Sequence, residues 1–242
     1  MARTNNPQEF LNSLELGQVS DLVSDIFVRY SYTNLVNDDH FKSLSITMEQ
    51  LVTMKNARGE QHPDGAFLKR WIECKIREKF VNQEQDNHPH IIIHRHGITW
   101  PLKVRERFED FCVSKNEKKI KKINFLNIYC HHIILRLIVG RSGRQLPLLA
   151  AKKNHEEASH LCDTTGCLRE EHLCIEKREI NRSRIGCGGI VLTIFRNIAG
   201  ECCIFQVNPC EHGIQHPDAN GDYLRYSCRK IQVVCREQRK SV

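Results

Sequence analysis

A short segment, residues 159 to 187, holds the side chains best suited to metal chemistry. Cys162, Cys167 and His172 follow one another with four residues between neighbours. Thiolate sulfur and imidazole nitrogen are the ligands that zinc takes in a tetrahedral site. Asn181 lies in the same segment and offers a neutral oxygen, which suits a magnesium-type ion. The segment therefore predicts a centre in which zinc holds the scaffold and a second divalent ion serves a reaction.

Two further side chains could take part in that reaction. His160 lies two residues before Cys162, and a neutral imidazole is a suitable general base near pH 7. Arg184 follows Asn181 by three residues, so both can lie near one face of a helix. Two alternatives stay open, because His160 could be a fourth zinc ligand and Asn181 an ordinary surface residue.

The segment resembles the core of the His-Cys box homing endonucleases, which belong to the wider His-Me finger (ββα-metal) nucleases. The resemblance covers about thirty residues and rests on these positions at matching spacings: Ser159-His160-Leu161-Cys162, Cys167, His172-Leu173, Asn181, Arg184 and Cys187. It implies an α+β fold with a ββα-metal core of antiparallel strands, stapled by structural zinc. A mainly helical N-terminal region, for which the resemblance offers no counterpart, would be added to that core.

The resemblance also implies where the elements of this core lie. His160 would lie on or beside the first strand, and residues 172 to 176 would form the second. Residues 177 to 185 would form the helix that carries Asn181. Gly186 would end this helix, because glycine readily adopts the left-handed conformation that follows many helices.

The activity implied by the resemblance is that of a metal-dependent DNA endonuclease, which hydrolyses phosphodiester bonds. His160 would be the general base, and Asn181 would hold a catalytic magnesium ion. A cation near the phosphate would offset its developing charge, and the candidates are Arg184, Lys121, Lys122 and Arg136. The alternative function is a catalytically inactive, zinc-stabilised module that binds nucleic acid or regulates another protein.

Two structural zinc ions are implied, and each needs four ligands. In the family, the fourth ligand beside Cys162, Cys167 and His172 comes from an upstream cysteine. We expect Cys112 to be that ligand, with Cys130 as the alternative.

The second zinc site would begin at Cys187. Cys210 and His212 supply the C-x-H element of the family, after an insertion of more than twenty residues. Cys228 is the expected last ligand, and His216 and Cys235 are the alternatives.

Composition bounds the possible classes of protein. The chain has 242 residues, a net charge of +7 and 12 cysteines, which allows one large or two small domains and fits a nucleic-acid partner. The N-terminus has no apolar signal segment, so zinc is favoured over disulfides. An intracellular, for example nuclear, location is expected, with no membrane as partner.

Because ten of the cysteines follow residue 129, we expect two regions. Residues 1–100 would be mainly helical and of unknown role, and residues 101–242 would form the zinc-bound endonuclease-like domain.

The hydrophobic pattern predicts the elements outside the motif. Helical spacing favours helices over residues 7–30, 47–55 and 66–81, and a polar linker follows at 81–90. Residues 91–93 read as a buried strand inside a group of four histidines (His88, His90, His94 and His96) that could also bind metal. From residue 116 the β-branched and apolar composition predicts strands as far as residue 150, with a tight turn at 140–143.

The expected partner is double-stranded DNA, with a homodimer as one arrangement. The strand-rich region 118–150 is the expected DNA-binding face, although lysine-rich strands can also be simple solvated edges. Its basic residues are Lys118, Lys119, Lys121, Lys122, Arg136, Arg141 and Arg144.

Overall fold

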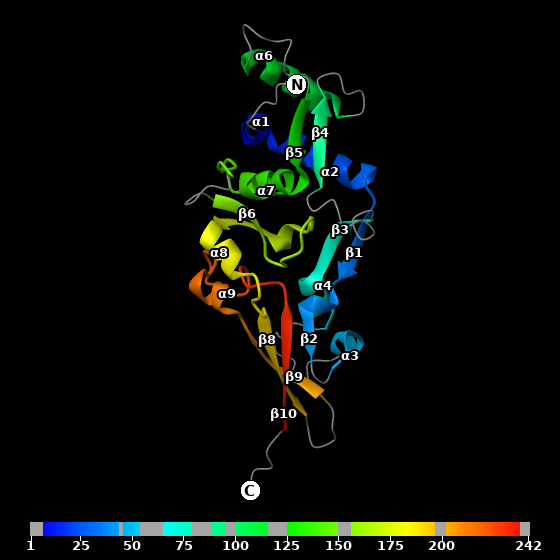
Figure 1. Ribbon diagram of the computed structural model, residues 1–242, viewed down its shortest axis with the longest axis vertical. Helices are drawn as coiled ribbons and strands as arrows, with labels where there is room; N and C mark the ends of the chain where they lie inside the picture. Colours follow the sequence, from blue (N-terminus) through cyan, green and yellow to red (C-terminus); the bar gives the residue numbers. More distant parts are fainter. Residues whose placement is uncertain are drawn as a thin grey trace. The chain divides into compact units, whose positions relative to one another are not determined.

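The computed structural model describes residues 7–43, 46–53, 65–78, 89–94, 100–115, 125–149, 156–196 and 202–237. The chain contains helices together with several small, separate sheets (Figure 1), so the fold is α+β. Residue contacts divide the chain into two compact units. The first comprises residues 1–33, 75–159 and 165–178, and the second comprises residues 34–74, 160–164 and 179–242. Within the described part of the chain, no helix has the length and apolar character needed to cross a membrane.

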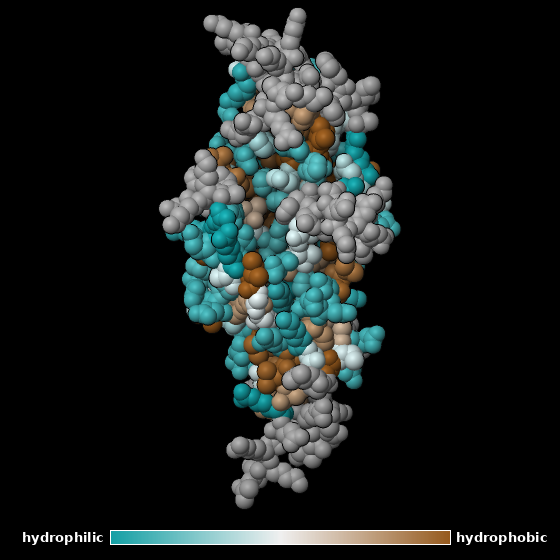
Figure 2. Space-filling view, viewed as in Figure 1, coloured by the Kyte–Doolittle hydropathy of each residue, from teal (hydrophilic) through white to brown (hydrophobic). Residues whose placement is uncertain are grey.

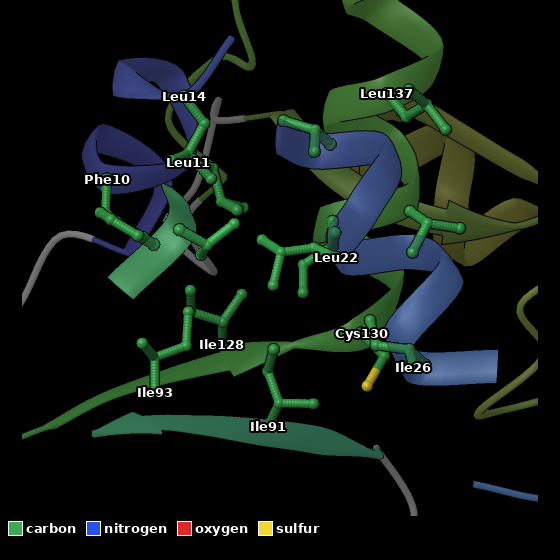
Figure 3. Close-up of a cluster of buried hydrophobic side chains, with 14 of the residues drawn as sticks. Phe10, Leu11, Leu14, Leu22, Ile26, Ile91, Ile93, Ile128, Cys130 and Leu137 are labelled. Atoms are coloured by element: carbon green, nitrogen blue, oxygen red, sulfur yellow. The ribbon is translucent and has the colours of Figure 1, made fainter. Parts of the chain in front are cut away.

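The first unit is built around four helices: α1 (Pro7–Ser13), α2 (Leu16–Arg29), α6 (Leu102–Lys115) and α7 (Cys130–Arg141). Helical spacing places Val19, Leu22, Val23 and Ile26 on the buried face of α2. Figure 3 shows Leu22 and Ile26 pointing toward Ile91 and Ile128 of two neighbouring strands, with Phe10 and Leu11 of α1 in the same cluster. These residues exclude water from one continuous core, which is the main source of stability for such a unit.

Two pairs of strands accompany these helices. β4 (His90–His94) pairs antiparallel with β5 (Phe125–Tyr129), and Ile91 lies opposite Ile128. β6 (Glu156–His160) and β7 (Leu173–Lys177) form a two-stranded sheet of their own, and the short 3₁₀ helix η3 (Glu170–His172) leads into β7. A further pair joins β1 (Tyr32–Val36) to β3 (Glu73–Arg77). The strands expected at 91–93 and 172–176 are therefore confirmed.

The expectation of strands throughout residues 116–150 is wrong in the described part of this region. After β5, the chain forms α7 from Cys130 to Arg141. Ten of its twelve residues are buried, and a helix that is buried on all sides has no amphipathic helical period in the sequence. The turn after it is present, with Gly143 at φ 72°, but residues 144–149 form no strand.

Of the basic residues named for a DNA-binding face, the three that the structure describes, Arg136, Arg141 and Arg144, lie in no strand. Arg136 is buried within α7 and donates hydrogen bonds to the carbonyl oxygens of Leu11, in α1, and of Leu14, which directly follows α1. Arg141 pairs with the carboxylate of Glu170. The four lysines between residues 118 and 122 lie outside the described residues.

The second unit contains a four-stranded mixed sheet in the order β2-β10-β8-β9. Its strands are β2 (Phe41–Ser43), β8 (Ile190–Arg196), β9 (Cys202–Asn208) and β10 (Ile231–Glu237). β10 runs parallel to both β2 and β8, whereas β8 and β9 are antiparallel. Alternate side chains of β8 and β10 point to one face and form a second core with residues of α3 (Met48–Thr53) and α4 (Gly65–Ile72).

Most helical predictions hold. Residues 7–30 form α1 and α2, and residues 48–53 form α3. The helix expected over 66–81 ends at Ile72, where the chain continues as β3, so that prediction is wrong beyond α4. Residues 81–88 of the predicted linker lie outside the described residues, as do His88 and His96. The remaining elements are η1 (Asp38–His40), α8 (Arg178–Ser183) and α9 (Glu211–Gln215).

Candidate functional site

The elements around the sequence motif follow the order strand, strand, helix. β6 ends at His160, where the backbone N–H of Asp163 donates to the His160 carbonyl over 2.9 Å and turns the chain. β7 leads directly into α8, which carries Asn181. Gly186 ends this segment in the left-handed region at φ 83°. The secondary structure expected around the motif is thus confirmed.

The loop after His160 has an unusual backbone. Asp163 adopts φ 53° and Gly166 adopts φ 82°, a region that glycine, asparagine and aspartate tolerate best. The carboxylate of Asp163 accepts a contact from Lys230 Nζ at 3.3 Å. Cys162 and Cys167, at the two ends of this turn, are both fully buried. The tight turn thereby brings two thiols together away from water.

The first metal-type group comprises Cys74, Cys162, Cys167 and His172, all buried, with their ligand atoms within 4.8 Å of one another. Cys167 Sγ lies 3.7 Å from His172 Nδ1. A tetrahedral zinc ion with ordinary Zn–S and Zn–N bonds would separate such atoms by about 3.6 Å. The spacing and the donor types therefore fit zinc.

Cys74 takes the place in this group for which the sequence favoured Cys112. Cys112 lies on α6 and is 1% exposed in the core of the first unit. Cys130, the alternative, belongs to the same core. Cys74 lies in β3, 88 residues before Cys162, and no local spacing in the sequence marks it as a ligand.

His40 is a second residue that sequence reasoning missed. It is 2% exposed, and its Nε2 lies 2.9 Å from Thr164 Oγ1 in the turn between Cys162 and Cys167. Its other ring nitrogen lies 3.3 Å from the Ile72 carbonyl oxygen and 3.9 Å from Cys74 Sγ. A histidine that contacts the residues around metal ligands, without being a ligand itself, helps to hold those ligands in position.

The second metal-type group comprises Cys187, Cys210, His212 and Cys228, again with all ligand atoms within 4.8 Å. These are the four residues named for the second site from the sequence. His212 Nδ1 lies 3.9 Å from Cys210 Sγ and 3.7 Å from Cys228 Sγ, which again approximates the edge of a zinc tetrahedron. The backbone N–H of Cys228 donates to Cys210 Sγ over 3.2 Å, and such a contact stabilises a thiolate.

The three thiols of this group are linked by hydrogen bonds, which shift their pKa values in different directions. Hydrogen bonds from Cys187 and then from Cys228 lower the pKa of Cys210 well below its usual range. The pKa of Cys228 is raised by its contacts with Cys187 and Cys210, and that of Cys187 is raised by its contact with Cys210. Cys210 is therefore the first thiolate to form. A zinc ion would displace the remaining protons, so its affinity should increase with pH.

Arg184 faces this second group. Its side chain is buried, and Nη1 donates to the Tyr226 carbonyl oxygen at 2.8 Å and to Cys228 Sγ at 3.4 Å. Its neighbour Ser183 contacts His212, with 2.9 Å between Oγ and Nε2. The end of the segment that carries Asn181 is thus linked to the second group of ligands.

His160 and Asn181 are both half-buried. They come from β6 and α8, and no side chain of α8 is fully buried. Figure 2 shows a mostly hydrophilic surface over α8 and α9 on the side in view. A hydrophilic surface of this kind is compatible with the binding of a charged substrate. The roles of His160 and Asn181 stay predictions.

The fold and the two Cys/His groups define an α+β protein with zinc-type centres. Residues 102–239 match the family model described as the zinc-binding loop region of homing endonuclease. Because this match spans more than half of the chain, the chain belongs to that family. The match excludes Cys74. No curated protein and no solved structure shows a match to the chain.

Proposed function

We propose that the chain is a metal-dependent DNA endonuclease that hydrolyses phosphodiester bonds. The proposal is supported most by the order β6, β7 and α8, which carries His160 and Asn181 on neighbouring parts of one motif. Membership of a family defined by a region of homing endonucleases supports DNA as the substrate. A homodimer on double-stranded DNA stays a prediction.

In this proposal His160 removes a proton from the attacking water, since a neutral imidazole can accept a proton near neutral pH. Asn181 provides a neutral side-chain oxygen as a ligand for magnesium. When bound, a magnesium ion would offset negative charge on the phosphate and on the leaving oxygen. His160 would therefore activate the water, and Asn181 would hold the ion that offsets the negative charge.

Arg184 has a structural place in this proposal. A guanidinium that is 2% exposed and already donates to Tyr226 and Cys228 cannot reach a phosphate without breaking those contacts. Arg136 is excluded on the same ground, because it is buried against α1. Of the cations named from the sequence, Lys121 and Lys122 stay candidates for the contact with the phosphate.

A nicking assay on supercoiled plasmid tests the activity. The zinc-loaded wild type should nick DNA when magnesium is present and not when it is omitted. His160→Ala should lower the rate by roughly 10²- to 10⁴-fold, the usual contribution of a general base, and Asn181→Ala should raise the magnesium concentration that half-maximal nicking requires. His216→Ala is the matched control, because His216 is exposed and belongs to neither metal-type group.

Two results would contradict the proposal. Equal nicking by the wild type and by His160→Ala would remove the general base. Absence of nicking by a zinc-loaded wild type that still binds DNA would leave the alternative function, a zinc-stabilised module without catalysis.

A further inference from the structure

The helix that carries Asn181 has little hydrophobic anchorage of its own. α8 contains six residues, and none of its side chains is fully buried. Helices this short are not stable by themselves in water and depend on tertiary contacts. The position of Asn181 therefore depends on polar contacts of α8 and its flanks. Arg178, at the start of α8, pairs with Glu157 at 3.6 Å, and Ser183 and Arg184, at its end, meet the second metal-type group.

The first of these contacts is a chain of hydrogen bonds that starts at a ligand. Nδ1 of His212 faces the sulfurs of Cys210 and Cys228. If Nδ1 binds zinc, Nε2 must carry the ring proton. It then donates a hydrogen bond to Ser183 Oγ, 2.9 Å away. The Ser183 hydroxyl in turn donates to the Ile180 carbonyl oxygen over 2.8 Å. Ile180 directly precedes Asn181, so the chain of bonds ends beside the proposed magnesium ligand.

The second contact is electrostatic. Three thiolates and one neutral imidazole around a zinc ion give a net charge of −1. The guanidinium of Arg184 is buried and lies 3.4 Å from Cys228 Sγ. A buried cation is costly unless it is paired, and the anionic zinc centre provides that pair. Zinc binding would therefore strengthen the hold on the residues that end α8.

We propose that Ser183 and Arg184 are positioning residues, through which zinc bound by Cys187, Cys210, His212 and Cys228 fixes α8 and orients Asn181. Occupancy of this zinc site thereby controls the affinity of the active site for its divalent ion. The inference rests on the proposed function for the role of Asn181. The link between Ser183 and the zinc ion does not depend on it.

The test uses the full-length, zinc-loaded protein and two measurements. The first is the rate of zinc release to a chromogenic chelator, with total zinc per chain. The second is the affinity for Mn²⁺ alone, followed by its electron paramagnetic resonance signal. Ser183→Ala should release one of two zinc ions more easily, with an affinity loss of roughly 10- to 100-fold as for other residues that support metal ligands. It should also weaken Mn²⁺ binding, and Ser183→Thr should restore both.

Ser114→Ala is the matched control. The Ser114 hydroxyl also donates to the carbonyl oxygen three residues earlier at the end of a helix, over 2.9 Å, but on α6. This control should leave zinc release and Mn²⁺ affinity unchanged. Arg184→Gln should also speed zinc release and weaken Mn²⁺ binding. If the buried guanidinium is essential for folding, Ser183→Ala still provides the test.

The outcomes separate the two proposals. If Asn181→Ala leaves Mn²⁺ affinity unchanged, the assigned role of Asn181 is wrong, and zinc release from Ser183→Ala still decides whether Ser183 supports the zinc site. If Asn181→Ala abolishes Mn²⁺ binding while Ser183→Ala changes neither measurement, the positioning role is overturned. Faster zinc release together with weaker Mn²⁺ binding supports it.

Discussion

Thr164 Oγ1 lies 2.9 Å from His40 Nε2, and this contact joins the turn between two metal-type cysteines to the segment just before β2. The ring of His40 also lies against the Ile72 carbonyl. Because the imidazole is buried, its removal takes one hydrogen-bond partner from the partly buried Thr164 hydroxyl and one from the Ile72 carbonyl oxygen. The first group of ligands therefore depends on a residue far from it in the sequence.

Replacement of this histidine should cost stability. His40→Leu replaces the imidazole by an apolar side chain of similar size and removes both hydrogen bonds. We expect a loss of about 1–3 kcal/mol, the usual penalty when a buried polar group loses its partner. Urea unfolding of the zinc-loaded protein measures this loss. The same substitution at exposed His216 should change stability by less than about 0.5 kcal/mol. Similar unfolding midpoints for the two variants would show that the contact with Thr164 contributes little.

The first zinc site should lose its ion when Cys74 is replaced, and not when Cys112 is replaced. Cys74→Ser removes one of the four clustered ligand atoms, so elemental analysis should show a fall from two zinc ions per chain toward one. Cys112→Ser places a hydroxyl in an apolar core and should lower stability while both zinc ions stay bound. Loss of zinc from Cys112→Ser, with retention by Cys74→Ser, would reverse the assignment of the fourth ligand.

Stability should decrease in alkaline solution because of a buried thiol and a buried phenol in the first unit. Burial raises the pKa of Cys130 from 9.0 to about 12, and burial likewise raises the pKa of Tyr32 above its usual 10.0. Above pH 9.0 the unfolded chain therefore loses these protons before the folded chain does. The contribution to stability is complete below about pH 9 and is lost as the pH rises toward 12.

Urea unfolding at pH 7.5 and pH 10.5 checks this dependence. The free energy of unfolding should fall between the two values in the wild type, and it should fall less in Cys130→Ala, which lacks the thiol. An equal decrease in both proteins would assign the alkaline loss to other groups.

The turn after His160 should discriminate between side chains by their backbone preference. Asp163 adopts φ 53°, where asparagine is tolerated and a β-branched residue is strained. Asp163→Asn and Asp163→Val both remove the charge that faces Lys230, so the difference between them isolates the backbone. Asp163→Val should be less stable than Asp163→Asn by about 1–2 kcal/mol, as measured by chemical denaturation. Equal stabilities would mean that the turn relaxes to another conformation.

The sequence predicts the elements near the motif well because their signals are local. For the second group, the resemblance implies Cys187 and a C-x-H element, which Cys210 and His212 match. Cys228 is one of three candidates for the last ligand, beside His216 and Cys235. The strand that ends at His160 and the helix that carries Asn181 are implied by the resemblance of the motif to the His-Cys box family. The fourth ligand of the first group could not be found in this way, because Cys74 reaches the group only through the tertiary fold.

The helix α7 marks the other limit of sequence reasoning. Its run of isoleucine, leucine and valine has the composition of a strand, but a fully buried helix can have the same composition. Burial of Ile133, Ile134 and Leu135 on consecutive positions is possible because other elements of the first unit surround this helix. The surroundings, which are set by residues far away in the chain, decide between the two structures.

The β8–β9 hairpin begins three residues after Cys187 and ends two residues before Cys210, and both cysteines belong to one group of ligands. A metal ion bound there would close this stretch into a ring, and the entropy of closing a ring grows only slowly with its size. The connection between Arg196 and Cys202 is therefore a place where added residues should cost little. A peptide tag or a small fluorescent domain could be grafted there while the ends of the hairpin stay clamped.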